Sequence, residues 1–517
     1  MVIVRFLSAV IVLIILCLPG CEGRRQVGKW ERFELIFHAE PQGNPFTAVR
    51  LGAVFTSPGG ESVEVEGFYD GDGRGGSSGD VYKIRFAPPE LGPWQYKISS
   101  NIKGLGGTGG GFDCVASGKK GPLVRDRLYP WYLRWADGGF FFETGANDPE
   151  SFLAAGFASQ PQRLEAIDCL AEAGCNILYF GMVNAGPGDG GPGEKVTPWR
   201  GGFDNPDFET ICLDFMNRLE GVLDRMAERG VVAHLVFYLD DCGGISRRIT
   251  PSQEELWFRY TAARFGSYPG LVWDLAEEFE EEFDLEWCTS RAAWLKKYDQ
   301  LKHPVTVHQL SADSFAPAGN PGFDLTALQY NTTDPDSLNA AVLKVRRQVE
   351  EAGRPVPVSL IEWTPVEPGQ AEQARKGIWA IATAGGTCQI FNKDQRPVEL
   401  DFGKWAEHWR SAAVLRKLFE SLPFERMTPD NSLVSAGFCL ALPGTCCLVY
   451  QPRGGEFSLK LPQAEKAYFA YWVDPRQGRL TAAGEVARAG GELVFSTPDS
   501  TDWALLITDR PRADLSR

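Results

Sequence analysis

The stretch Tyr268-Pro269-Gly270-Leu271-Val272-Trp273-Asp274-Leu275-Ala276-Glu277-Glu278-Phe279 decides the fold that we expect for this chain. Its apolar run is too short for a helix, begins after Pro-Gly and ends in two acids. This pattern is typical of a buried parallel strand whose C-terminal end carries carboxylates. The stretch Val356–Trp363 has the same form and places Glu362 at the end of a second apolar strand. Two glutamates at strand ends predict catalysis by paired carboxylates.

Strands and helices alternate around both stretches, from Leu128 to about Asp394. Amphipathic segments such as Phe208–Arg229 and Leu338–Ala352 lie between candidate strands. Eight strand-helix units predict a (β/α)8 TIM barrel, which we place at residues 128–420. A doubly wound open sheet is the main alternative, but it would normally carry a phosphate loop or another switch-point signature. The candidate strands are residues 140–143, 176–180, 231–238, 271–275, 305–308, 325–330, 356–361 and 387–391.

All-β patterns precede and follow the predicted barrel. Short alternating runs separated by Gly, Pro and Asp turns fill residues 27–126 and predict an antiparallel, immunoglobulin-like β-sandwich. A similar pattern over residues 430–512 predicts a second antiparallel β-sandwich. The expected fold class is therefore multidomain, with a central TIM barrel between two sandwiches, because 517 residues are too many for one core.

Residues 1–21 have the pattern of a bacterial lipoprotein signal peptide. Arg5 supplies the positive start, and the apolar run Phe6–Leu18 is shorter than the roughly 20 residues that span a bilayer. Leu18-Pro19-Gly20-Cys21 resembles a lipobox, in which Cys21 becomes the lipidated first residue of the mature chain. Plain cleavage with an incidental cysteine is the alternative. We expect export to the cell envelope and a lipid anchor at the outer membrane or cell surface.

Composition restricts the ligands of the chain. A net charge of -15 and a pI near 5.0 would repel nucleic acid and anionic lipid, so the lipid anchor is the one membrane contact we expect. The aromatic content of 12%, with 15 Trp, suits stacking against sugar rings, although large cores also account for much of it. The cysteines form no C-x-x-C pair and no H-E-x-x-H spacing occurs, so we infer neither a metal nor a cofactor. Disulfide pairing stays open.

The central region resembles the retaining glycoside hydrolases of clan A. Within that clan it looks like an exported bacterial group that has a sandwich before the barrel and a collagen-binding-like module after it. The segment Tyr260–Glu278 resembles the helix-to-strand passage that leads to the clan's acid/base glutamate. Outside the barrel, the resemblance rests on Trp30–Glu34, Asn44–Phe46, Gly67–Gly73, Gly92–Tyr96, Tyr471–Gly478 and Pro498–Leu506.

This resemblance implies roles for three glutamates. Glu278 aligns with the acid/base and Glu362, at the end of the seventh strand, with the nucleophile. The clan pattern reads Asn-Glu, whereas this chain has Glu277 at the Asn position, so a carboxylate would replace the amide that usually bonds the sugar 2-hydroxyl. The structural alternative for Glu278 is an exposed acidic face, because acids follow it from Glu280 to Glu286.

Polar residues at other predicted strand ends are candidates for binding sugar hydroxyls. These are Asn147, Asn184, His308, Tyr330 and Asn392, and Trp363 could supply a stacking platform. Each is equally well explained as a hydrogen-bonded loop or core residue.

The function we expect is that of a retaining glycoside hydrolase, acting on an extracellular polysaccharide or glycoconjugate by a two-glutamate double displacement. A non-catalytic carbohydrate- or matrix-binding surface lipoprotein with the same barrel is the alternative. A structural envelope protein is a third hypothesis. A binding protein would not need both glutamates, which favours the enzyme. The sequence predicts neither the sugar and linkage nor the oligomeric state.

Overall fold

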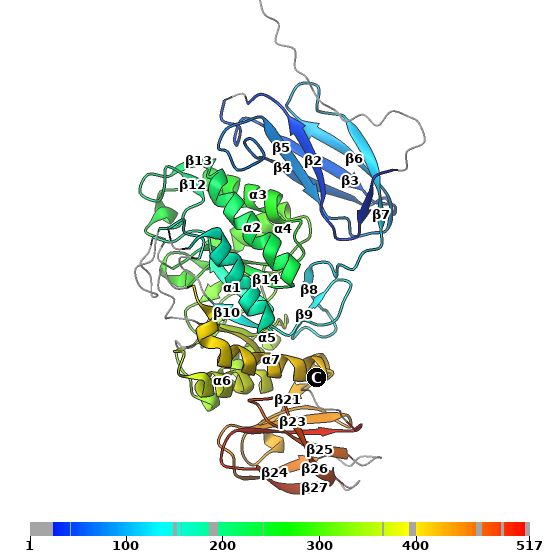
Figure 1. Ribbon diagram of the computed structural model, residues 1–517, viewed down its shortest axis with the longest axis vertical. Coiled ribbons are helices and arrows are strands. Elements are labelled where there is room, and N and C mark those ends of the chain that lie inside the picture. The colour runs from blue at the N-terminus through cyan, green and yellow to red at the C-terminus, as the bar shows by residue number, and fades with distance from the viewer. Residues whose placement is uncertain are drawn as a thin grey trace, which may run out of the picture.

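The computed structural model describes residues 24–41, 43–147, 152–156, 158–185, 195–240, 242–363, 367–391, 400–461, 468–486 and 491–511. The chain forms three parts that follow one another along the long axis of the molecule (Figure 1). A β-rich part formed by the N-terminal residues lies at one end, a barrel surrounded by helices lies in the middle, and a second β-rich part lies at the other end.

The middle part is a nearly closed barrel of parallel strands. Within the described residues nine strands pair in the order β16-β15-β14-β11-β10-β20-β19-β18-β17. Val307 alone separates β16 from β17, so these two are pieces of one strand and the ring has eight strand positions. The strands are β10 (Thr144–Asn147), β11 (Ile177–Gly181), β14 (Val232–Tyr238), β15 (Leu271–Ala276), β16 (Val305–Thr306), β17 (His308–Gln309), β18 (Ala327–Gln329), β19 (Ser359–Glu362) and β20 (Thr387–Phe391).

Helices surround this barrel because their apolar faces pack against its strands. Two of them begin at capping boxes, Ser159 with Gln162 and Thr250 with Gln253, each followed by a proline in the first turn. The helices are α1 (Gln160–Glu172), α2 (Leu213–Arg229), α3 (Pro251–Phe265), α4 (Leu285–Tyr298), α5 (Pro335–Glu351), α6 (Ala371–Thr383) and α7 (Ala406–Glu420). Short 3-10 turns are η1 (Ile245–Arg247), η2 (Phe279–Glu281), η3 (Phe402–Trp405), η4 (Phe424–Arg426) and η5 (Asn431–Leu433).

Three predicted boundaries in the barrel are wrong. The first strand begins at Thr144, not at Phe140, because Phe142 packs against Phe419 and Phe424 instead of joining the sheet. The seventh strand begins at Ser359, not at Val356, since Pro357 has no N–H to donate to a neighbouring strand.

The third wrong boundary is the start of the helix predicted at Phe208. Residues 207–211 alternate between exposed and buried positions, and they form β13 (Asp207–Ile211), which pairs with β12 (Trp199–Arg200). Helix α2 therefore begins at Leu213.

The N-terminal part is a sheet folded over on itself. In the part of the chain that the structure describes it has seven strands, in the order β1-β7-β6-β3-β4-β5-β2. Phe33 of β2 stacks on Phe112 of β7, with ring centroids 4.3 Å apart, so opposite ends of the sheet face each other. The strands are β1 (Gln26–Gly28), β2 (Phe33–His38), β3 (Leu51–Thr56), β4 (Ser62–Tyr69), β5 (Val81–Phe86), β6 (Gly92–Ser100) and β7 (Gly109–Val115). A hairpin of β8 (Leu123–Arg125) and β9 (Leu133–Trp135) leads into the barrel.

The C-terminal part has two sheets that share an apolar cluster containing Phe457, Trp472 and Leu505. Its strands are β21 (Thr428–Pro429), β22 (Phe438–Leu442), β23 (Cys446–Gln451), β24 (Glu456–Leu461), β25 (Tyr468–Val473), β26 (Leu480–Val486), β27 (Gly491–Ser496) and β28 (Trp503–Thr508). Of these, β24 and β27 form the smaller sheet. Arg375 of α6 donates two hydrogen bonds to the buried Asp502, which joins this part to the barrel.

A buried ionic cluster joins the N-terminal sheet to the barrel. Arg264 of α3 contacts Asp70 beside β4 at 2.8 Å and Glu220 of α2 at 2.7 Å, and only 1% of its side chain is exposed. Arg85 of β5 bonds the same Glu220 and also Glu34. Burial alone would raise the pKa of Glu220, but Arg85 and Arg264 lower it to about 2. One carboxylate therefore pairs with an arginine from each side of the interface.

Among the described residues no helix combines the length and the apolar character needed to cross a bilayer.

The ionic cluster predicts that Arg264→Ala will strongly destabilise the protein. Removing the guanidinium leaves Asp70 and Glu220 short of a partner in a buried place, at a cost of about 3–5 kcal/mol in the free energy of unfolding. Chemical denaturation checks this. Lys344→Ala is the control, because Lys344 and Asp313 form an exposed pair and its loss should leave the denaturation midpoint unchanged. Equal midpoints for Arg264→Ala and the wild type would contradict the prediction.

Candidate active site

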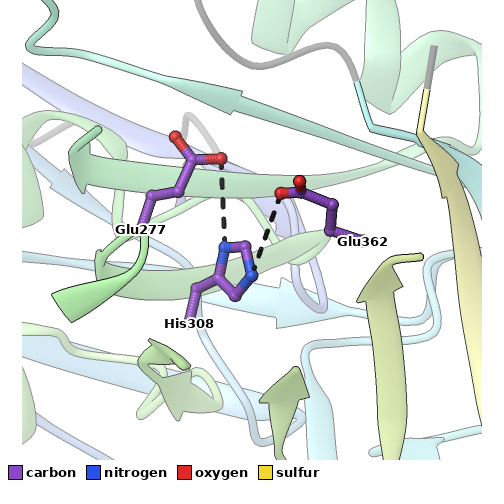
Figure 2. A group of neighbouring side chains, drawn as sticks. All are labelled: Glu277, His308 and Glu362. Atoms are coloured by element: carbon purple, nitrogen blue, oxygen red, sulfur yellow. Dashed lines mark ion pairs between the residues drawn. The ribbon is translucent and has the colours of Figure 1, made fainter. Parts of the chain in front are cut away.

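Two buried glutamates lie close together at the C-terminal end of the barrel, although their strands are not adjacent. Glu277 directly follows β15, Glu362 is the last residue of β19, and their exposed fractions are 5% and 6%. A carboxylate oxygen of each and one ring nitrogen of His308 all lie within 4.8 Å of one another. Figure 2 shows the imidazole between the two carboxylates. The barrel thus brings together three residues that are far apart in the sequence.

His308, the first residue of β17, is fully buried between these glutamates. Its Nδ1 is 3.9 Å from Glu277 Oε1, and its Nε2 is 4.0 Å from Glu362 Oε2 (Figure 2). Its backbone N–H donates to Asp274 Oδ1 at 3.1 Å, and the Tyr179 hydroxyl lies 3.2 Å from Nδ1. Burial, and then electrostatic repulsion from His234, lower the pKa of His308 to about 3. The ring is therefore neutral at pH 7.

The Glu362 side chain and its strand are held by three further contacts. Gln329 Nε2 donates to Glu362 Oε1 at 2.8 Å, and the two residues face each other in the register of β18 and β19. The Tyr330 backbone N–H donates to the Glu362 carbonyl at 2.8 Å. Asn147 Nδ2 donates to the Ile361 carbonyl at 3.0 Å. These bonds fix the end of β19, and so the position of the Glu362 carboxylate.

A chain of buried polar groups continues into the barrel below His308. His234 Nε2 lies 3.0 Å from Asp274 Oδ2, and Gln389 Nε2 lies 2.9 Å from His234 Nδ1. The same Gln389 nitrogen donates to Glu143 Oε1 at 2.8 Å. These hydrogen bonds connect side chains from three strands and from Glu143, and so help to hold the base of the site rigid.

Glu278 belongs to a different group of carboxylates from Glu277. It adopts a left-handed backbone conformation, with φ 40° and ψ 50°, which is uncommon for a residue other than glycine. Oxygens of Asp240, Glu278 and Glu281 gather within 4.8 Å of one another, and these three residues are less buried than the Glu277 group. The donor types of both groups could also hold a divalent cation.

The other predicted site residues differ in burial, and some of them lie outside the described part of the chain. Asn147 and Asn184 are fully buried, and the backbone of Asn184 pairs with Val196. Tyr330 is half-buried beside Glu362. Asn392 lies outside the described residues, as do residues 1–23 with Cys21.

Trp363 does not form the stacking platform that we predict from the sequence. The side chain is fully buried, and its Nε1 donates to the Gln389 carbonyl at 3.0 Å. Because Gly377 of α6 lies against the ring, both faces are enclosed in the described part of the chain and cannot meet a sugar.

Sequence reasoning missed Tyr179, Gln329, Gln389 and Glu143. The first three stand inside strands, where a polar residue in an apolar run is the one available signal. Glu143 stands just before β10 and ends the apolar run Phe140–Phe142, so an acid after such a run was its signal.

Comparisons with known proteins agree with this fold. Residues 26–101 match a family described as a domain of unknown function, DUF5060, and residues 431–508 match the "Putative collagen-binding domain of a collagenase". No curated protein matches the chain.

Solved structures with the same fold are glycoside hydrolases. A "putative glycoside hydrolase" from Bacteroides vulgatus is 20% identical, with a TM-score of 0.77 over 94% of this chain and 100% of that one. A family 5 glycoside hydrolase from the same organism is 16% identical, with a TM-score of 0.61 over 75% of this chain and 94% of that one. Another structure named "Glycoside hydrolase" is 14% identical, with a TM-score of 0.60 over 75% of this chain and 97% of that one. The chain therefore has the barrel fold of these hydrolase structures.

The close packing behind Glu362 predicts that Gly377→Ala will destabilise the barrel. A Cβ at Gly377 would lie 2.5 Å from Cζ3 and 2.6 Å from Cη2 of Trp363, whose fully buried ring has little room to move. Overpacking of this kind costs about 1–3 kcal/mol, which thermal denaturation should detect. Gly369→Ala is the control, since an added Cβ there meets no described atom within 4 Å. A melting temperature equal to that of the control would show that the ring yields freely.

Proposed function

We propose that the protein is a retaining glycoside hydrolase acting on an extracellular polysaccharide or glycoconjugate. The observation that carries this proposal is the buried pair Glu277 and Glu362, which face each other across His308 at the end of the barrel where such enzymes have their active sites. The glycoside hydrolases with the same fold support the class of reaction. The chemistry needs two carboxylates and water, and no cofactor.

In the proposed mechanism Glu362 is the nucleophile. Its carboxylate attacks the anomeric carbon, while the acid protonates the leaving oxygen, and a glycosyl-enzyme ester forms as the glycosidic bond breaks. The same acid, now ionised, then removes a proton from water, which attacks the anomeric carbon and releases Glu362. The side-chain amide of Gln329 donates an N–H to the Glu362 carboxylate and takes no proton from it. It therefore supports this carboxylate in both steps.

The acid/base is assigned to Glu277 in this proposal. Glu277 shares its group with Glu362, whereas Glu278, the residue that aligns with the clan's acid/base, gathers with Asp240 and Glu281. Oxygens of Glu277 and Glu362 within 4.8 Å support retention, for which the carboxyl groups are about 5–5.5 Å apart. Inversion needs roughly 6.5–9.5 Å, so that a water fits between the two groups. Glu278 stays the alternative acid.

Amide variants of the three glutamates test the proposal. Glu362→Gln should abolish turnover, because an amide cannot attack the anomeric carbon. Glu277→Gln should lower kcat by about 10²–10⁴-fold on substrates with poor leaving groups and spare formation of the ester from activated aryl glycosides. Azide should then rescue that variant, since it attacks the anomeric carbon of the ester without a base and leaves as the glycosyl azide. The measurements are aryl release from the aryl glycosides and sugar release from a panel of plant, algal and host glycans.

Glu278→Gln is the matched comparison for the acid/base assignment. It should retain activity on poor leaving groups and show no azide rescue, and the reverse result would transfer the acid role from Glu277 to Glu278. Proton NMR of the first product gives the stereochemistry, and a product of inverted configuration would contradict the double displacement. Binding of glycans without turnover by the wild type would favour a carbohydrate-binding protein instead.

We also propose that Cys21 carries a lipid anchor and that the flanking parts are β-sandwich modules of a lipoprotein. The lipobox-like sequence Leu18–Cys21 supports the anchor. Stable anchoring requires more than one acyl chain, as a bacterial lipoprotein has. Wild-type protein should then sediment with membranes, whereas Cys21→Ser should be released or left unprocessed, as judged by cell fractionation. Wild-type protein found free in the periplasm or medium would contradict the anchor.

A further inference from the structure

Nε2 of His308 is a buried polar atom in the active site that has no hydrogen-bond partner among the described residues. It is 4.0 Å from Glu362 Oε2, which is too long for a direct hydrogen bond. A buried donor or acceptor without a partner costs about 1–3 kcal/mol, so an unpaired ring nitrogen beside a catalytic carboxylate indicates a place for a ligand. A hydroxyl group between the two atoms would satisfy both.

Tyr179 fixes which ring nitrogen of His308 carries the proton. Burial raises the pKa of Tyr179 well above its usual value, so its hydroxyl is protonated. Among the described residues this hydroxyl lies 3.2 Å from His308 Nδ1, and a phenol donates readily to an imidazole lone pair. Nδ1 therefore accepts, and the neutral ring carries its proton on Nε2. Nε2 is then a donor that lies 4.0 Å from Glu362 Oε2.

The position of this donor selects one hydroxyl of the sugar. The nucleophile Glu362 must lie beneath the anomeric carbon, and the nearest hydroxyl to that carbon is on its ring neighbour, C2. A donor 4.0 Å from a carboxylate oxygen of the nucleophile can reach this hydroxyl, while Glu362 accepts its proton. Hydrogen bonds to the 2-hydroxyl strengthen as the oxocarbenium-like transition state forms.

We propose that His308 donates a hydrogen bond from Nε2 to the 2-hydroxyl of the sugar that Glu362 attacks. This inference rests on the proposed glycosidase function. His308 is thereby a catalytic residue that contacts substrate, and Tyr179 is a positioning residue that acts through it.

The test compares an aryl glycoside that the wild type turns over with its 2-deoxy analogue. The ratio of kcat/KM for the two substrates measures what the 2-hydroxyl contributes, and the intrinsic reactivity of the 2-deoxy sugar cancels when variants are compared. In His308→Ala the ratio should fall by about 10- to 100-fold, as expected for one strong hydrogen bond. The loss should come from the 2-hydroxy substrate, with the 2-deoxy substrate nearly unaffected.

Two further variants keep the test decisive if His308→Ala does not fold. His308→Gln places an amide N–H near the position of Nε2 and should retain most of the ratio. Tyr179→Phe keeps the packing of the ring, removes the hydroxyl that fixes the tautomer, and should lower the ratio partly. His408→Ala is the control, because His408 is a buried histidine of α7 outside the site, and its ratio should equal that of the wild type.

The outcomes separate the inference from the function on which it rests. A ratio that is the same in the wild type, His308→Ala and Tyr179→Phe overturns the role of His308, while an inactive Glu362→Gln leaves the glycosidase standing. An equal loss of kcat/KM on both substrates in His308→Ala also overturns the role of His308 as a donor, because such a loss indicates a structural role. Failure of the wild type to turn over any glycoside overturns both proposals.

Discussion

Two carboxyl groups held close together in a place with little water are the feature on which the rest of the site depends. Oxygens of Glu277 and Glu362 approach within 4.8 Å, and both side chains are almost wholly buried. Two such groups repel each other whenever both are ionised, so neighbouring dipoles must hold them in place. The amide of Gln329 and the neutral ring of His308 supply those dipoles, and the buried chain from Asp274 to Glu143 holds the strands beneath them. The polar interior therefore fixes side chains that would otherwise move apart.

The local backbone decides which acid faces the site. Strand β15 delivers Glu277 inward, and the left-handed turn at Glu278 then changes the direction of the chain before the next residue. Two adjacent glutamates thus enter separate groups, one deep and one near the surface. A break in the fifth strand position has a related effect, because Val307 interrupts the ladder and leaves the His308 N–H to bond the Asp274 side chain. Irregular backbone at Glu278 and at Val307 therefore determines how Glu277 and His308 are placed, which regular strands alone would not do.

The barrel could be predicted from the sequence because its strands are continuous apolar runs separated by amphipathic helices. Buried strands covered by helices require this pattern. The sequence also identified Glu277, Glu362 and His308 as candidates, since each follows an apolar run. The resemblance gave the acid/base role to Glu278, and the residue order carried no sign of the left-handed turn that places Glu278 and Glu277 in different groups. Burial of Trp363 was equally hidden, as it depends on Gly377 from a distant helix. Side-chain direction at strand ends comes from tertiary packing, which a pattern of apolar residues does not encode.

The ionic cluster around Glu220 also bears on how such chains can be recombined in evolution. Its guanidinium partners come from a strand of the N-terminal sheet and a helix of the barrel, and Glu220 itself comes from a second helix. A gene fusion that brought a different N-terminal module would present Glu220 and Arg264 to a surface lacking Arg85 and Asp70. The two helices and the sheet therefore depend on one another for their charge partners, although the sequence pattern divides them into separate domains.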